Sequence, residues 1–420
     1  MRLFSSGLRC LYVIVGVGVV SGLGVAEESE VPERAKAGEA QVPDRVVSES
    51  QEEAGKLKAK TLYKVSGPWG DLEYYMIYVT APDEYLKYWP MPTEVTEWYF
   101  GRAKAEDAQL FIRELNISDE RIDGEQPSAR FFENAGDLIL YPNRALVLSL
   151  TDEQRQRVAE RLVRDPRNRF YTDPVVVESG DPETWFRDAG LNEETVSTLA
   201  KLCYRRGSTV LFSDVPYALS RQKTLEERRN LVRAITRTRS LVLRLAVGGG
   251  SKMEDIVNYW TAGHKRKDLL PILRSVVEVP EVERIDVVHL LPPTPRMLLY
   301  TFPSLASAVT GELKDCHWTS TNFFREVPEG VISEWAVRGE RMFAEMEPAT
   351  GEPRFGDTIV LYERETDRIL HSMTYIAADV VFTKNGNSLF RPWVLMRYAD
   401  VVARFAYGQE TVARIFRPTS

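Results

Sequence analysis

The sequence predicts an α+β protein in which a mixed, mostly helical region precedes a domain built on an antiparallel strand meander. From residue 61 to about residue 250, helix-capping residues are repeatedly followed by apolar residues at helical spacing. From about residue 300 onward, short apolar or alternating segments are separated by turn signals, a pattern typical of antiparallel strands. These two patterns divide the ordered chain into residues 61–250 and residues 251–420.

The amino terminus has the pattern of a secretory signal peptide over residues 1–26. Arg2 and Arg9 precede an apolar stretch, Leu11 to Val20, and small residues close the segment at Ala26. A membrane span needs about 20 consecutive apolar residues, and this stretch is shorter, so a cleaved signal is favoured over an uncleaved anchor. We therefore expect a periplasmic or extracellular protein with no stable membrane span after cleavage.

Residues 27–60 are rich in Glu, Ala, Ser and Lys and contain no aromatic residue. Such a segment cannot bury enough apolar surface to offset the entropy of ordering, so we predict a disordered tether. The whole chain carries a formal net charge of −7. Because a nucleic-acid-binding surface is strongly basic, we expect no nucleic-acid partner.

Capping residues predict three helices in the first ordered region. Thr151 and Gln154 have capping-box spacing, and Asp181 with the proline after it opens a second helix. Asn192 can cap a third helix, whose apolar face would include Cys203. We therefore expect Cys203 to be buried.

Strands are predicted at residues 208–212 and 241–247, so this region is not purely helical. Three glycines, residues 248–250, indicate a hinge before the second domain. Residues 285–291 read as a further strand, in which His289 is expected to be packed.

After signal cleavage only two cysteines remain, Cys203 and Cys316, which allows one disulfide or two free thiols. The four histidines are scattered, and no Cys or His pair has metal-ligand spacing. We predict no metal site and no cofactor.

Asp315 and Cys316 begin a predicted helix over residues 316–324. A thiol at a helix amino terminus is close to unpaired backbone N–H groups and to the positive end of the helix dipole, which favour the thiolate. Cys316 is therefore a candidate nucleophile. The alternatives are a packed thiol or a bridge to Cys203. His317, the next residue, is expected on the helix surface; the alternative is that its adjacency to the thiolate lets it tune the pKa of Cys316.

Three strands are predicted downstream, at residues 358–362, 370–377 and 380–383, and the third ends at the turn signal Asn385-Gly386. His371 lies on the second strand. Alternation places it on the same face as Met373 and Tyr375. On its own, a strand histidine is more often packed than catalytic.

A cysteine opening a helix, a Gly-Asp pair before a strand, and a histidine on the next strand resemble the NlpC/P60 family of cell-wall peptidases. The matching residues are Asp315-Cys316, Gly356-Asp357, and His371 followed by Tyr375-Ile376. The resemblance covers residues 300 to 400 and implies a papain-like α+β core for residues 251–420. The sequence departs from the family pattern in the residues after Tyr300 and after Cys316.

The resemblance implies that Cys316 is the nucleophile, that His371 is the general base, and that a third polar residue orients the histidine. Strand parity places Thr383 and Asn385, but not Lys384, on the same face as His371. An amide carbonyl accepts a hydrogen bond with better geometry than a hydroxyl, so we choose Asn385. The alternative is that Asn385-Gly386 is simply a turn.

The predicted function is that of an exported cysteine hydrolase that cleaves amide bonds in peptidoglycan or other envelope peptides. The resemblance implies that Tyr300 contacts the substrate, and we place Trp318, two residues after the nucleophile, in the same group. One alternative is a non-catalytic envelope binding protein that keeps the fold. Another is a thiol-dependent acyl transferase acting on lipid or ester substrates.

Overall fold

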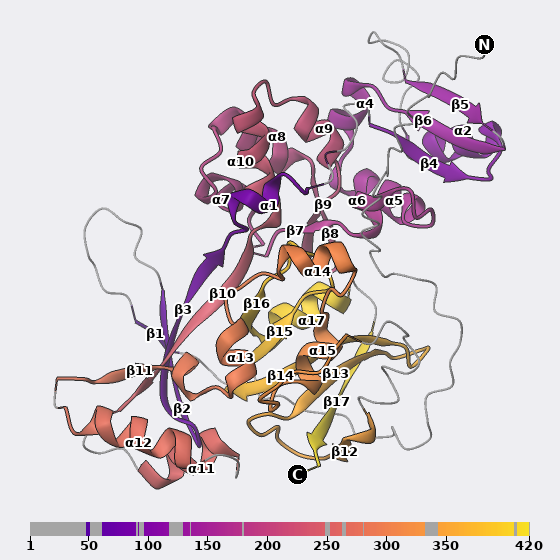
Figure 1. The fold of residues 1–420 in the computed structure, drawn as a ribbon. Helices are drawn as coiled ribbons and strands as arrows, with labels where there is room; N and C mark the ends of the chain where they lie inside the picture. Colours follow the sequence, from indigo (N-terminus) through magenta and orange to yellow (C-terminus); the bar gives the residue numbers. More distant parts are fainter. Residues whose placement is uncertain are drawn as a thin grey trace, which may run out of the picture.

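The computed structural model describes most of the chain from residue 61 onward together with a short strand before it (Figure 1). The described residues are 48–50, 61–89, 91, 96–116, 129–134, 136–178, 180–247, 253–262, 266–279, 281–331, 343–406 and 410–419. The predicted signal peptide and the predicted hinge at residues 248–250 lie outside them. So does the predicted tether, apart from residues 48–50, which form a strand. Within the described part of the chain, no helix is long and apolar enough to cross a membrane.

The first sheet has five antiparallel strands in the order β1-β2-β3-β10-β11. Their bounds are β1 Ser48–Ser50, β2 Leu62–Gly67, β3 Gly70–Val79, β10 Thr238–Ala246 and β11 Arg284–Asp286. In Figure 1, β3 and β10 form a long ribbon that runs from the upper helices down to α11 (Met253–Thr261) and α12 (Arg266–Val277). The sheet thus contains strands from both sides of the predicted domain boundary at residue 250.

Between β3 and β10 the chain forms the helical region and two small sheets, with strand orders β4-β6-β5 and β7-β9-β8. The helices are α1 Asp83–Leu86, α2 Ala105–Glu114, α4 Arg144–Ser149, α5 Asp152–Leu162, α6 Arg169–Thr172, α7 Pro182–Asp188, α8 Glu193–Lys201, α9 Val215–Ser220 and α10 Leu225–Thr236. The strands are β4 Trp98–Gly101, β5 Arg130–Asn134, β6 Asp137–Tyr141, β7 Val175–Val176, β8 Cys203–Arg206 and β9 Thr209–Phe212.

The helix starts predicted from capping residues are confirmed. Thr151 and Gln154 form a reciprocal capping box on α5, and the Asp181 side chain caps α7 ahead of its proline. The Asn192 side chain accepts a hydrogen bond from the backbone N–H of Thr195 at 2.8 Å and caps α8. Cys203 is buried as predicted, but it begins β8 instead of lying on α8, because the helix ends at Lys201.

The second sheet has six antiparallel strands in the order β12-β17-β13-β14-β15-β16. The strands are β12 Met346–Ala349, β13 Thr358–Glu363, β14 Ile369–Ala377, β15 Val380–Lys384, β16 Trp393–Arg397 and β17 Thr411–Pro418. The helices that accompany this sheet are α13 Pro293–Leu298, α14 Leu305–Thr310, α15 Cys316–Thr321 and α17 Tyr398–Ala406. The predicted α+β class and the three predicted meander strands are confirmed.

Hydrogen bonds join the two large sheets. The Ser240 hydroxyl on β10 donates to the carbonyl oxygen of Leu395 on β16 and accepts from its backbone N–H, each at 3.1 Å. The Tyr74 hydroxyl on β3 donates to the Asp379 carboxylate at 3.1 Å. One apolar core contains residues of both sheets, among them Leu243 and Phe382. The second sheet is therefore built against the first.

The strand predicted over residues 285–291 is wrong beyond Asp286. The Asp286 carboxylate accepts a hydrogen bond from the backbone N–H of Val288 at 2.9 Å and begins a 3-10 helix, Val287–Leu290. His289 therefore lies on a helical turn instead of a strand. The predicted helix from Cys316 is shorter than expected and ends at Thr321.

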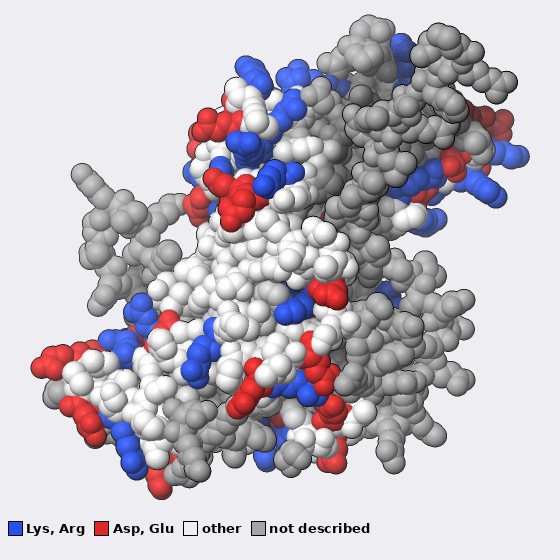
Figure 2. Space-filling model, viewed as in Figure 1, with Lys and Arg blue, Asp and Glu red and all other residues white. Residues whose placement is uncertain are grey.

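Charged side chains of both signs are interspersed on the face shown in Figure 2. They gather over the upper helices, at the upper right, and over the lower left and lower centre of the molecule, whereas the band between these groups carries few of them. This distribution is that of an ordinary solvated protein surface.

Candidate active site

Cys316 is the first residue of α15, and the residue before it caps the helix. The Asp315 carboxylate accepts a hydrogen bond from the backbone N–H of Trp318 at 2.8 Å, which satisfies one of the free donors of the first helical turn. The helix packs on β14 and β15. Cys316 is only 6% exposed. The local sequence thus places a thiol at a capped helix amino terminus that faces the sheet.

His371 lies near the start of β14 and is completely buried. Its Nε2 atom is 2.8 Å from the Thr383 hydroxyl oxygen on β15, and that hydroxyl donates its proton to the carbonyl oxygen of Ser372 at 3.4 Å. The Thr383 oxygen must therefore accept from Nε2–H, because a hydroxyl has one proton. In this tautomer Nδ1 is the basic nitrogen, and Nδ1 is buried without a hydrogen-bond partner.

Two histidines determine the electrostatics of Cys316. Burial by itself raises the pKa of the Cys316 thiol. The charges on His317 and on His371 act against burial and lower this pKa well below its ordinary value. The result favours a buried thiolate paired with imidazolium, the charge state of an activated cysteine nucleophile.

His317 is buried, although the sequence predicted it on the helix surface. The Ser320 hydroxyl donates to the Ser372 hydroxyl oxygen at 3.3 Å, and the Ser372 oxygen is 3.0 Å from His317 Nδ1. Ser372 on β14 thus links His317 to Ser320, four residues after the thiol on the same helix. Each of the two histidines near Cys316 is thus held by a buried hydroxyl group: His371 Nε2 by Thr383 and His317 Nδ1 by Ser372.

Lys384 is a third buried group near the thiol. Its Nζ atom donates to the carbonyl oxygens of Gly386 at 2.6 Å and Ser388 at 3.1 Å, which closes the turn after β15. Burial lowers the pKa of Lys384 to about 7, while the charges of Asp315 and Cys316 raise it. Its contacts lie apart from the Thr383–His371 pair, as strand parity predicts.

Asn385, the residue chosen from the sequence to orient His371, does not make that contact. Its amide donates to the sulfur of Met396 at 3.1 Å, and its carbonyl oxygen is buried without a hydrogen-bond partner. The reason is that β15 ends at Lys384, so Asn385 already belongs to the turn that leads toward β16. The orienting hydrogen bond comes from Thr383, two residues earlier on the same face.

Tyr300 and Trp318, the two predicted substrate contacts, both have internal hydrogen bonds. The Tyr300 hydroxyl donates to the carbonyl oxygen of Leu241 on β10 at 2.6 Å. The Trp318 indole donates to the carbonyl oxygen of Glu329 at 2.8 Å, and its ring packs edge-on against Trp393 with centroids 6.4 Å apart. Through these contacts both side chains pack against the protein interior. Their role in substrate binding stays a prediction.

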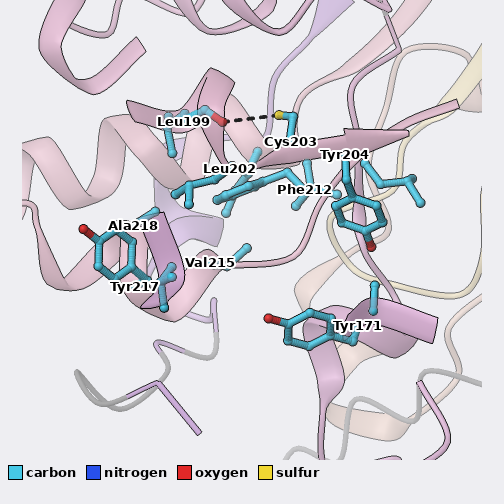
Figure 3. Packing of buried hydrophobic residues seen from close by; sticks show 14 of the residues in the cluster. Tyr171, Leu199, Leu202, Cys203, Tyr204, Phe212, Val215, Tyr217 and Ala218 are labelled. Carbon is cyan, nitrogen blue, oxygen red and sulfur yellow. Dashed lines mark hydrogen bonds between the residues drawn. The ribbon is translucent and has the colours of Figure 1, made fainter. Parts of the chain in front are cut away.

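Cys203 lies in the core of the helical region, as Figure 3 shows. Its thiol donates to the carbonyl oxygen of Leu199 at 3.3 Å, the contact drawn as a dashed line. Burial raises the pKa of Cys203 well above that of a free thiol. Cys203 and Cys316 are both free, so the structure does not contain the alternative disulfide between them.

Among the described residues, no group of three His, Cys, Asp or Glu side chains is arranged to hold a metal ion. No protein-family model matches this chain, and no curated protein or solved structure matches it either. The function is therefore inferred from the geometry around Cys316.

Proposed function

We propose that the protein is an exported cysteine hydrolase with a papain-like core, acting on amide bonds of cell-wall peptides. The main support for this function is the pair of buried histidines that lower the pKa of Cys316 at the start of α15. A structural thiol has no need of two buried imidazoles held by hydroxyl groups, whereas a nucleophile is activated by such neighbours.

In the proposed reaction Cys316 and His371 both act in the acylation step and again in the deacylation step. The Cys316 thiolate attacks the amide carbonyl carbon, and the His371 imidazolium gives its Nδ1 proton to the leaving amine, which leaves a thioester. His371 then takes a proton from water as the water oxygen attacks the thioester, the Cys316 thiolate leaves with release of the acid, and the thiolate–imidazolium pair is restored. The Thr383 hydroxyl oxygen accepts from Nε2–H of His371 throughout, and the charge on His317 stabilises negative charge on the sulfur.

The packing of α15 supports a papain-like arrangement. Besides the serine bridge from His317 to β14, the Trp393 indole of β16 donates to the Thr319 hydroxyl at 2.9 Å. The helix carrying the thiol is therefore bonded directly to the sheet that carries the histidine. This arrangement, together with the sequence resemblance, is the support for cell-wall peptides as the substrate class.

The test is release of soluble fragments from purified peptidoglycan, followed by mass spectrometry. The expected result is amide cleavage by the mature chain, its complete loss in Cys316→Ala, and its retention in the matched variant Cys203→Ala. No cleavage combined with hydrolysis of an ester, or transfer of its acyl group, would instead favour the acyl transferase.

The burial of the site gives one specific reason to keep a second candidate. Cys316 is 6% exposed and His371 is not exposed at all. A binding protein that has lost catalysis would tolerate such a closed site. It would show no turnover of amide or ester substrates, while the Cys316→Ala variant would bind peptidoglycan as well as the unmodified chain does.

A further inference from the structure

The imidazole of His371 is covered on one face by the ring of Phe405, which belongs to α17. The two rings are stacked, with centroids 3.9 Å apart and planes inclined by 14°. The hydrogen bond to Thr383 fixes one atom of the imidazole but leaves the ring free to swing about that contact. The stacked ring removes this freedom. The two contacts together fix the direction of Nδ1.

Helix α17 is in turn held by the part of the chain that precedes residue 250. Arg404, the neighbour of Phe405, pairs with the Glu178 carboxylate at 2.8 Å, and the two side chains are only 6% and 5% exposed. The Thr209 hydroxyl donates to the carbonyl oxygen of Ala403 at 2.5 Å. The other Glu178 carboxylate oxygen accepts from the backbone N–H of Arg239, also at 2.5 Å. Arg404 and its neighbour Ala403 are thus tied to the first half of the chain.

We propose that Phe405 is a positioning residue for His371 and that the helical region holds it in place through the Glu178–Arg404 pair. This inference rests on the proposed role of His371 as the base. It gives the region before residue 250 a part in the chemistry at Cys316. An aromatic face also attracts a cation, so Phe405 stabilises the imidazolium form that the thiolate requires.

The test follows the pH dependence of Cys316 alkylation by iodoacetamide, a readout that needs no substrate. Phe405→Leu is expected to raise the pH at the midpoint of the alkylation curve by roughly 0.5 unit or more. The reason is that the His371 imidazolium is then stabilised less and its Nδ1 atom is held less firmly. Phe405→Tyr keeps the stacked ring and is expected to behave as the unmodified chain. In turnover, Phe405→Leu is expected to lower kcat roughly tenfold with KM little changed, a small part of what positioned acid–base catalysis contributes.

Glu178→Gln tests the anchoring of α17, and it is expected to shift the midpoint in the same direction as Phe405→Leu. Arg404→Lys, which keeps the charge but not the planar fork, is a milder second test in case the first variant does not fold cooperatively. The matched control is Glu193→Gln, which removes an exposed ion pair with Arg187 in the same region and is expected to change nothing.

An unchanged midpoint in Phe405→Leu would overturn the proposal. So would faster alkylation at an unchanged midpoint, because Phe405 would then only cover the site. A midpoint shift in Phe405→Leu without one in Glu178→Gln or Arg404→Lys would overturn the anchoring role. A shift in both, with no turnover by any form of the protein, would support positioning while contradicting the proposed hydrolase.

Discussion

The surroundings of Cys203 and those of Cys316 differ in polarity although both thiols are buried. Cys203 lies among apolar side chains in the helical region and donates to a backbone carbonyl. Cys316 begins a helix beside two histidines. Burial raises the pKa of the first thiol, whereas neighbouring charge lowers that of the second. Burial alone therefore does not determine whether a cysteine is reactive, because the neighbouring groups decide which charge state of the thiol is stable.

The largest expected effect is a difference in alkylation between the two thiols. At pH 7 an ordinary thiol is only about 3% thiolate, and Cys203 is expected to be far below that. Cys316 is expected to be mostly thiolate and to react with iodoacetamide at least about a hundredfold faster than Cys203. Peptide mapping by mass spectrometry gives both rates from one sample. Equal rates would remove the distinction between the two sites.

The second effect is the removal of one of the two histidines. In the folded chain the His371 imidazolium favours thiolate, so the pKa of Cys316 is expected to rise in His371→Ala. An opposite charge nearby typically lowers a pKa by about 1–3 units, so a rise of about 1–2 units is expected when one of two such charges is lost. The alkylation midpoint measures this rise. Cys203 provides the internal control, since its rate is expected to stay the same. A midpoint that does not move would mean that His317 alone sets the charge state.

The third effect separates the two residues that sequence spacing put forward as orienting groups. Thr383→Val leaves the Nε2–H of His371 without an acceptor, and an unmade buried hydrogen bond costs about 1–3 kcal/mol. A fall in kcat of roughly tenfold or more is therefore expected. Asn385→Ala removes only the contact with Met396 and is expected to change kcat less than about threefold. The reverse order would return the orienting role to Asn385.

The smallest effect compares one helix cap from each region. Asp315→Ala and Asn192→Ala each remove a side-chain cap, and each is expected to lower the free energy of unfolding by about 1 kcal/mol. Urea titration measures both. Similar costs would show that the two helices are capped equally well, so that the contrast between the two cysteines comes from the histidines. A loss above about 3 kcal/mol for Asp315→Ala alone would mean that α15 depends on its cap more than an ordinary helix does.

Local rules predicted the parts of the fold that depend on a few adjacent residues. The caps at Thr151, Asp181 and Asn192 and the strands β13, β14 and β15 were predictable because capping and alternation act within a few residues. The 3-10 turn that carries His289 was not predictable, since the apolar run there is equally compatible with a strand. The pairing of β10 with β11 was missed because it joins residues on opposite sides of the predicted hinge.

At the candidate site the sequence put forward Cys316 and His371 from their order, and strand parity limited the residue bonded to His371 to Thr383 or Asn385; the hydrogen bond is made by Thr383. Parity cannot choose between these two, because both lie on the same face. The choice depends on where β15 ends, which is a property of the sheet. The burial of His317 and the stacking of Phe405 depend on contacts between distant segments, and neither residue type nor spacing indicates them.

Contacts between the two sheets affect how the polypeptide can be cut into fragments that still fold. Strand β11 pairs with β10, Ser240 on β10 exchanges hydrogen bonds with Leu395 on β16, and Tyr300 bonds to Leu241. A polypeptide cut between Val247 and Met253 would therefore behave as a split protein, in which each fragment supplies the template on which the other completes its sheet. Co-production of the two fragments is expected to restore a single assembly, whereas the second fragment alone would expose the apolar face that β10 normally covers.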